Sequence, residues 1–164
     1  MITIQDIQAY KPISTYATNI MNYEREAIEF DVKPLVGAAF WHDIDTNPST
    51  VPNVLLLNGG TYIVDNKTIP FAGLKAVLVY YSYARYVAQN NIQDTPSGQH
   101  RLQDDWSVPP SVKEMQLKID QIKSGAVAYW KQCEDFLNEN EANYPLWKGC
   151  KVGKKILSQK IYKI

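Results

Sequence analysis

The stretch from Phe71 to Ile92, FAGLKAVLVYYSYARYVAQNNI, constrains the fold more than any other part of the chain. Its apolar residues recur at spacings of three and four, which marks one face of an α-helix, and other apolar and aromatic residues cover most of the remaining surface. A helix that is apolar nearly all round needs other elements around it. The pattern therefore predicts a buried central helix with Pro70 in its first turn. Arg85 is expected to lay its stem on apolar surface and place its guanidinium in a polar seam.

A second and longer helix is predicted from Ser111 to about Asn143. Its apolar residues are spaced alternately by three and four, as in a heptad seam: Val112, Met115, Ile119, Ile122, Ala126, Tyr129, Cys133 and Phe136. This helix would be longer than the central one, so one end must project or meet another subunit. An interior glycine, Gly125, costs about 1 kcal/mol relative to alanine. We therefore expect close packing at this point, most simply against the central helix in an antiparallel pair.

Shorter helices and one hairpin are predicted ahead of the central helix. Thr3 is a candidate cap for a short first helix. A second helix, beginning near Asn19, has an apolar face that should point inward: Ile20, Tyr23, Ala27 and Phe30. Pro34 either kinks this helix or opens a third one. Two short β-rich runs on either side of residues 65–67 predict a β-hairpin.

A chain of 164 residues suits one domain with a sizeable core. The sequence thus predicts a mainly α fold: a small helical bundle with a buried central helix, a long C-terminal helix and a minor β-hairpin. Residues 1–147 form the predicted helical domain, and residues 148–164 form a basic tail.

The charges divide unevenly between these two parts. The chain has 17 Lys and Arg residues and 17 Asp and Glu residues. The tail contains six of the lysines and no acidic residue, so residues 1–147 have a net charge of 11 − 17 = −6. A basic tail can bind nucleic acid, a membrane surface or an acidic partner, or can simply be solvated. Aliphatic residues among these lysines, such as Ile156 and Leu157, lead us to expect that the tail becomes ordered against a partner.

The sequence shows no constellation typical of an enzyme, a metal site or a cofactor site. His42 and His100 are far apart, with no cysteine at ligand spacing. Residues 149–154 have three residues between two glycines, where a phosphate-binding loop needs four. Cys133 falls on an apolar helix face, where a reduced thiol packs as a small hydrophobe. No secretory signal and no apolar run of about twenty residues is present, so we expect synthesis in a cytoplasm and no membrane partner.

Residues 93–110, QDTPSGQHRLQDDWSVPP, are predicted to form a long polar loop, and loops of this length without structure of their own are usually either functional or disordered. Gln99 to Leu102 could pair with another strand. The candidate interface residues of the whole chain lie in this segment and in the tail: Gln99, Arg101, Leu102, Trp106, Lys154, Lys155, Ile156, Leu157, Ile161 and Tyr162.

Four quoted stretches, taken in order, carry a resemblance to a known family: DVKPLVGAAFW, GGTY…KTIPFAGLKAVLVYYSYARYV, DTPSGQHRLQDDWS and AYWKQCEDFLNENEANYPLW. Together with the short N-terminal helix they resemble the head–tail connector proteins (adaptor or neck ring proteins) of tailed bacteriophages. The similarity is greatest to those of crAss-like and related phages of Bacteroidetes hosts. It covers Ile4 to Trp147, and the tail lies outside the shared pattern.

The resemblance implies a small, mainly helical virion protein at the head–tail interface that assembles into a ring, usually of twelve copies. Its implied partners are further copies of itself, the portal protein, the next tail or neck ring protein, and double-stranded DNA that passes through without sequence-specific binding. The tail is then expected to reach a neighbouring ring protein, for instance by adding a strand to an exposed sheet edge.

A cytoplasmic nucleic-acid-binding helical protein that uses the lysine-rich tail is the main alternative. It predicts an affinity that falls steeply as salt rises. A helical scaffold in a host complex is a third possibility, distinguished by expression outside infection.

Overall fold

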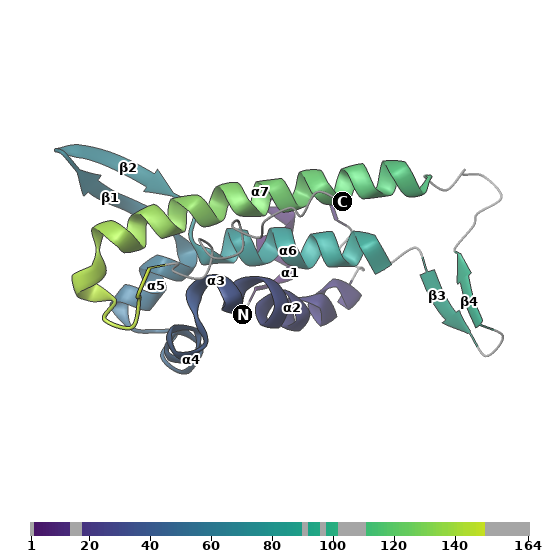
Figure 1. Cartoon of the computed structure of the whole chain (residues 1–164), viewed down its shortest axis with the longest axis horizontal. Coiled ribbons are helices and arrows are strands. Elements are labelled where there is room, and N and C mark those ends of the chain that lie inside the picture. The colour runs from purple at the N-terminus through teal and green to yellow at the C-terminus, as the bar shows by residue number, and fades with distance from the viewer. Residues whose placement is uncertain (1, 14–17, 90–91, 96–97, 102–110, 150–164) are drawn as a thin grey trace, which may run out of the picture.

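The computed structural model describes residues 2–13, 18–89, 92–95, 98–101 and 111–149 of the chain (Figure 1). Two long antiparallel helices, α6 (Leu74–Gln89) and α7 (Val112–Glu139), lie side by side, and the shorter helices pack on the α6 side of this pair. The other elements, in chain order, are α1 (Ile4–Gln8), the 3-10 turn η1 (Thr18–Met21), α2 (Asn22–Ala27), the π-helical turn η2 (Ile28–Val32), α3 (Lys33–Val36), α4 (Ala38–Thr46), α5 (Val51–Asn58), β1 (Gly60–Val64), β2 (Lys67–Phe71), β3 (Ile92–Thr95), β4 (Gly98–Arg101) and the 3-10 turn η3 (Glu141–Asn143). The predicted mainly α bundle is confirmed.

The central helix is enclosed as its sequence predicts. Nine of the 16 residues of α6 are buried, including the large side chains of Leu78 and Tyr81. The prediction that Pro70 opens this helix is wrong, because Pro70 lies in β2 opposite Thr61. Proline is tolerated in an edge strand, where its missing N–H breaks no ladder bond. The chain turns into α6 only after Gly73, whose φ of +78° is readily adopted by glycine.

The long helix α7 begins with a capping box. The Ser111 hydroxyl accepts a hydrogen bond from the Glu114 backbone N–H at 3.2 Å, and the Glu114 carboxylate accepts one from the Ser111 N–H at 2.8 Å. The helix ends at Glu139 rather than Asn143, because the Asn140 side chain and N–H both bond the Phe136 carbonyl and close the last turn.

Gly125 packs against α6, as predicted. A Cβ at this position would lie 2.4 Å from Cε1 of the Tyr80 ring, so only glycine fits against this ring without a shift. One residue of the predicted seam is misplaced: Val112 is 73% exposed. With 28 residues against the 16 of α6, α7 extends past its partner, and its first turn has no facing helix (Figure 1).

The predicted inward face of the second helix is partly wrong. Ile20 and Ala27 are fully buried, but Phe30 is 67% exposed, and Val32 takes the inward position instead. The cause is η2, because a π-helical turn holds an extra residue and rotates the side chains that follow it. Pro34 lies near the start of α3 and so opens a third helix, which Gly37 ends with a φ of +89°.

The hairpin β1–β2 is confirmed, with Tyr62 opposite Ile69 and Ile63 opposite Thr68. Asp65 and Asn66 form its turn with φ values of +49° and +63°, the left-handed geometry that Asn and Asp accept most readily. A second hairpin joins β3 to β4, so the prediction of a loop is wrong for residues 93–95 and 98–101, which form strands. The strand pairing suggested for Gln99 and Arg101 is present, whereas Leu102 lies outside the described residues.

Candidate assembly surfaces

Two of the ten predicted interface residues lie in the described part of the chain. Gln99 and Arg101 are in β4, opposite Asp94 and Ile92 of β3. The other eight, in residues 102–106 and 154–162, lie outside it, so their predicted roles stay predictions. The structure thus places one part of the predicted interface on a β-ribbon that extends from the end of α6 (Figure 1).

The two β-ribbons lie at opposite ends of the α6–α7 pair (Figure 1). The β1–β2 ribbon extends beyond the start of α6, and the β3–β4 ribbon follows its end. Each ribbon is a sheet of two strands, so within the described ranges its outer edges have no partner strand. Unpaired edges offer rows of backbone N–H and C=O groups to another chain. The chain therefore presents an unpaired β-edge at each end of the helix pair, and the two edges differ in sequence.

The β1–β2 ribbon has one attached and one open face. Tyr62 packs on Phe136 of α7 with ring centroids 5.4 Å apart, whereas Ile63, on the opposite face, is 73% exposed. Beside the base of the ribbon, Val51 and Val54 of α5 are exposed and line an open pocket of about 360 Å³. Sequence reasoning missed these apolar residues, although five aliphatic residues in the eight of α5 are more than one buried face can hold.

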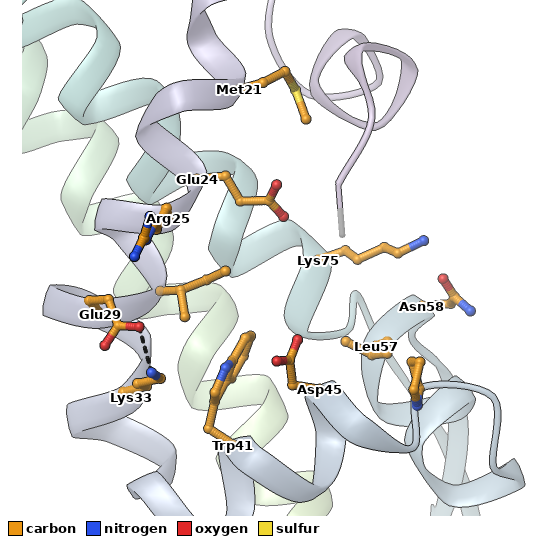
Figure 2. A pocket seen from close by; sticks show the side chains of 12 residues that line it. Met21, Glu24, Arg25, Glu29, Lys33, Trp41, Asp45, Leu57, Asn58 and Lys75 are labelled. Atoms are coloured by element: carbon orange, nitrogen blue, oxygen red, sulfur yellow. Dashed lines mark hydrogen bonds and ion pairs between the residues drawn. The ribbon is translucent and has the colours of Figure 1, made fainter.

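A cleft of about 630 Å³ lies between α2–α3 on one side and α4, α5 and the start of α6 on the other (Figure 2). Several of its lining residues are apolar: Met21, Ile28, Trp41, Pro48 and Leu57. Charged side chains of both signs line it in equal number: Glu24, Glu29, Asp45, Arg25, Lys33 and Lys75.

These charges are partly engaged within the cleft. The Glu24 carboxylate accepts a hydrogen bond from the Ile2 backbone N–H at 2.7 Å, which ties the N-terminal segment to α2. Glu29 pairs with Lys33 one turn later (Figure 2). A cleft with balanced charge and apolar lining residues suits a peptide segment better than a polyanion, because no net positive field attracts phosphate.

Arg85 occupies the polar seam that its position predicts. Its Nε donates to Asp31 at 2.8 Å and its Nη1 lies 3.3 Å from Glu26, so one guanidinium joins α6 to α2 and η2. The guanidinium carbon also lies 5.2 Å from the centroid of the exposed Phe30 ring. The π-helical turn thus brings Asp31 and Phe30 together around Arg85.

A tyrosine cluster covers the contact between α1, α6 and α7. Tyr80 packs edge to face on Tyr129, with ring centroids 5.1 Å apart, and on Tyr10 at 6.1 Å. The ammonium of Lys11 lies 3.9 Å from the centroid of the Tyr80 ring, and burial lowers its pKa. Burial likewise raises the pKa of Tyr10, with smaller contributions from Tyr129 and Tyr80. This cluster holds α1 in place rather than forming an open site.

The described ranges lack two kinds of feature, a cluster of metal-binding side chains and a membrane-spanning helix. They contain no group of three or more His, Cys, Asp or Glu side chains placed to hold a metal ion. Among the same residues, no helix combines the length and apolar character needed to cross a bilayer.

The sequence pattern of one protein family matches residues 32–156, well over half of the chain. That family is described as a family of unknown function, DUF6712. The chain belongs to the DUF6712 family. The DUF6712 match begins at the end of η2, covers the whole α6–α7 pair and continues past Gly149 to Ile156. The chain matches no curated protein and no solved structure.

Proposed function

We propose that this DUF6712 protein is a structural virion protein of a tailed bacteriophage, a subunit of the head–tail connector ring that joins the portal to the tail and lines the DNA exit channel. The resemblance of residues 4–147 to connector proteins motivates the proposal. The observation that carries it is the presence of two different β-ribbons at opposite ends of one rod-like helix pair (Figure 1).

A closed ring of identical subunits needs a heterologous contact, in which one surface of each copy meets a different surface of the next. The β1–β2 end exposes the apolar residues Ile63, Val51 and Val54 beside a polar turn at residues 65–67. The β3–β4 end has a different sequence, IQDT in β3 and GQHR in β4. Two chemically distinct ends support head-to-tail association, whereas a two-fold dimer needs only one self-complementary surface.

The charge of the body supports a role around DNA. Residues 1–147 carry a net charge of 11 − 17 = −6. A negative surface repels phosphate, so DNA can pass without adhering to the wall of the channel.

The test is the mass of the purified protein, alone and mixed with the portal of the same phage, by native mass spectrometry or light scattering. We expect a defined multiple of the subunit in complex with the portal. A matched control is the portal mixed with a variant in which Ile63 is replaced by Asp, which should weaken ring formation and leave the monomer folded.

A protein that stays monomeric and does not bind the portal would contradict the proposal. If this monomer bound DNA in low salt and released it as salt rose, the lysine-rich tail would be a nucleic-acid-binding element instead.

A further inference from the structure

An apolar groove runs along the segment that links α3 to α4. Residues 34–40 line one side, and Leu146, Lys148 and Gly149 line the other, around a volume of about 360 Å³. Leu146 is 43% exposed, whereas the neighbouring Trp147 is buried and donates its indole N–H to Asn138 at 3.0 Å. Trp147 therefore anchors the end of the helical body, and Leu146 is left facing the groove. We call this site the α3–α4 groove.

A second pocket of about 290 Å³ continues the groove. The two share Phe40 and Leu146, and the second adds Asp43 and reaches Asn143. Asp43 accepts hydrogen bonds from the side-chain amides of Asn47 and Asn53 but makes no ion pair with any described residue. The groove itself is therefore lined mainly by apolar residues. The pocket that continues it is more polar, and its Asp43 carboxylate lies among Asn47, Asn53 and Asn143.

The chain itself supplies a segment of matching chemistry at this place. Residues 150–157, CKVGKKIL, combine three aliphatic side chains with three lysines, and they follow directly on Gly149, which already lines the groove. From residue 149 to residue 156 is seven residues, an extended reach of up to about 24 Å. The apolar pair Ile156 and Leu157 can thus reach any part of the groove.

Two further observations favour a segment of the same chain as the occupant. The DUF6712 match runs through Ile156, so residues 150–156 belong to the same family pattern as the folded body. A short tether also gives an attached segment an effective concentration of about 1 mM or more, far above that of a second molecule in dilute solution.

We propose that residues 150–157 lie in the α3–α4 groove of their own subunit, with Ile156 and Leu157 against the apolar wall and the lysines toward Asp43. The segment covers apolar surface on residues 34–40 and Leu146, and so keeps this face closed in the free subunit. The proposal concerns the single subunit and does not depend on ring formation. It differs from the sequence-based expectation that the tail reaches a neighbouring ring protein.

Disulfide trapping in the full chain tests the proposal. In a Cys150→Ser background, one cysteine is placed in the groove (Ala38→Cys or Ala39→Cys) and one in the tail (Ile156→Cys or Leu157→Cys), which gives four pairs. Cys133 can remain, because it is buried. The matched control replaces the groove cysteine by Ala128→Cys, an alanine exposed on the outer side of α7.

Under mild oxidation we expect at least one groove pair to form a disulfide within a single chain, with a yield independent of protein concentration, and the control pairs to form none. Covalent dimers from the groove pairs, rising with concentration, would place the tail on a second copy and overturn the proposal. Absence of any disulfide in all four pairs would overturn it as well.

Hydrogen exchange in the full chain gives an independent readout. Replacing Ile156 and Leu157 by Asp should speed amide exchange in residues 34–40 and leave α6 unchanged. The matched variant, with Ile161 and Ile164 replaced by Asp, makes the same change in charge outside the docked segment and should leave residues 34–40 protected. Equal exchange in the two variants would contradict the docking.

Discussion

Gly125 determines how closely the two long helices approach one another. The Tyr80 ring occupies the space that a side chain at this position would need, and Tyr129, Tyr10 and Lys11 surround the ring. The ring therefore has little freedom to move aside. Glycine is the least favourable residue for a helix interior after proline, so its presence here reflects packing rather than helix stability.

Replacing Gly125 by Ala should destabilise the protein. Overpacking costs about 1 to 3 kcal/mol, and the gain in helix propensity returns about 1 kcal/mol. The net loss of unfolding free energy should be up to about 2 kcal/mol, measured by denaturant unfolding. In a Tyr80→Ala background the same change should become neutral or stabilising, because the ring is gone. Additive effects of the two substitutions would mean that the ring and Gly125 do not constrain one another.

Substitution of Tyr81 tests whether α6 lies in the core of the protein. Its side chain is 9% exposed, and burial, followed by the charge of Asp31, raises its pKa. Replacing Tyr81 by Ala should cost about 3 to 5 kcal/mol of unfolding free energy. Phe30→Ala is the matched control, because this ring is 67% exposed, and should cost under about 1 kcal/mol. A loss under about 1 kcal/mol for Tyr81 would place α6 at the periphery.

Cys133 gives a prediction on pH. Burial raises the pKa of its thiol from 9.0 to about 12. Between these values the unfolded chain releases the thiol proton and the folded chain keeps it, so the unfolding free energy falls as pH rises, by at most about 1.4 kcal/mol per pH unit.

The measurement is the melting temperature from pH 8 upward, in a Cys150→Ser background. The alkaline loss should be smaller in the Cys133→Ala variant. The native thiol should also resist alkylation at about pH 8.5, where free thiols are half ionised, and react fully after unfolding. Rapid alkylation of the folded protein would contradict the burial of this residue.

At the scale of elements, periodic patterns were the most informative part of the sequence. Both long helices, the cap at Thr3 and the β1–β2 turn follow from local spacing and turn chemistry, and the structure has all of them. Two errors came from features with no local signal. Nothing in IEFDV distinguishes a π-helical turn from an α-helical one, and Pro70 is compatible with both a helix start and an edge strand.

The candidate assembly surfaces were harder to predict than the fold. The β3–β4 ribbon was indicated by strand-like residues near Gln99, but the exposure of Ile63 depends on which face of β1 packs on α7. A one-residue shift of register would exchange Ile63 with Tyr62. The cleft beside Trp41 joins residues from five α-helices, α2 to α6, which no spacing rule brings together.

Deleting residues 97–105 tests the β3–β4 end of the subunit. This change removes β4, which makes no predicted contribution to the core, so circular dichroism and the melting temperature should stay close to those of the full chain. Association with the portal and ring formation should be lost. If the shortened protein unfolds, the ribbon belongs to the core, and if it assembles normally, this end is not an interface.

At the scale of the whole molecule, the α6–α7 pair defines a long axis with a different β-ribbon at each end (Figure 1). The body is acidic, the lysines of residues 148–164 follow it, and two unlike ribbons lie at the ends of the long helices (Figure 1). In the proposed ring, these unlike ends would contact different neighbours. It also means that any ring built head to tail has two unlike rims, each of which can recognise a different partner.

The antiparallel arrangement of α6 and α7 has a consequence for how fast the chain folds. The two helices are successive helices in the sequence, so only a short stretch of chain has to close into a loop before they meet. The contact between α1 and α6 joins residues much further apart in the sequence. Contacts of low sequence separation tend to form early. Substitutions at the Gly125 contact should then slow folding more than they speed unfolding, and substitutions in α1 should do the reverse. The helix pair would thus be the nucleus onto which the N-terminal helices condense.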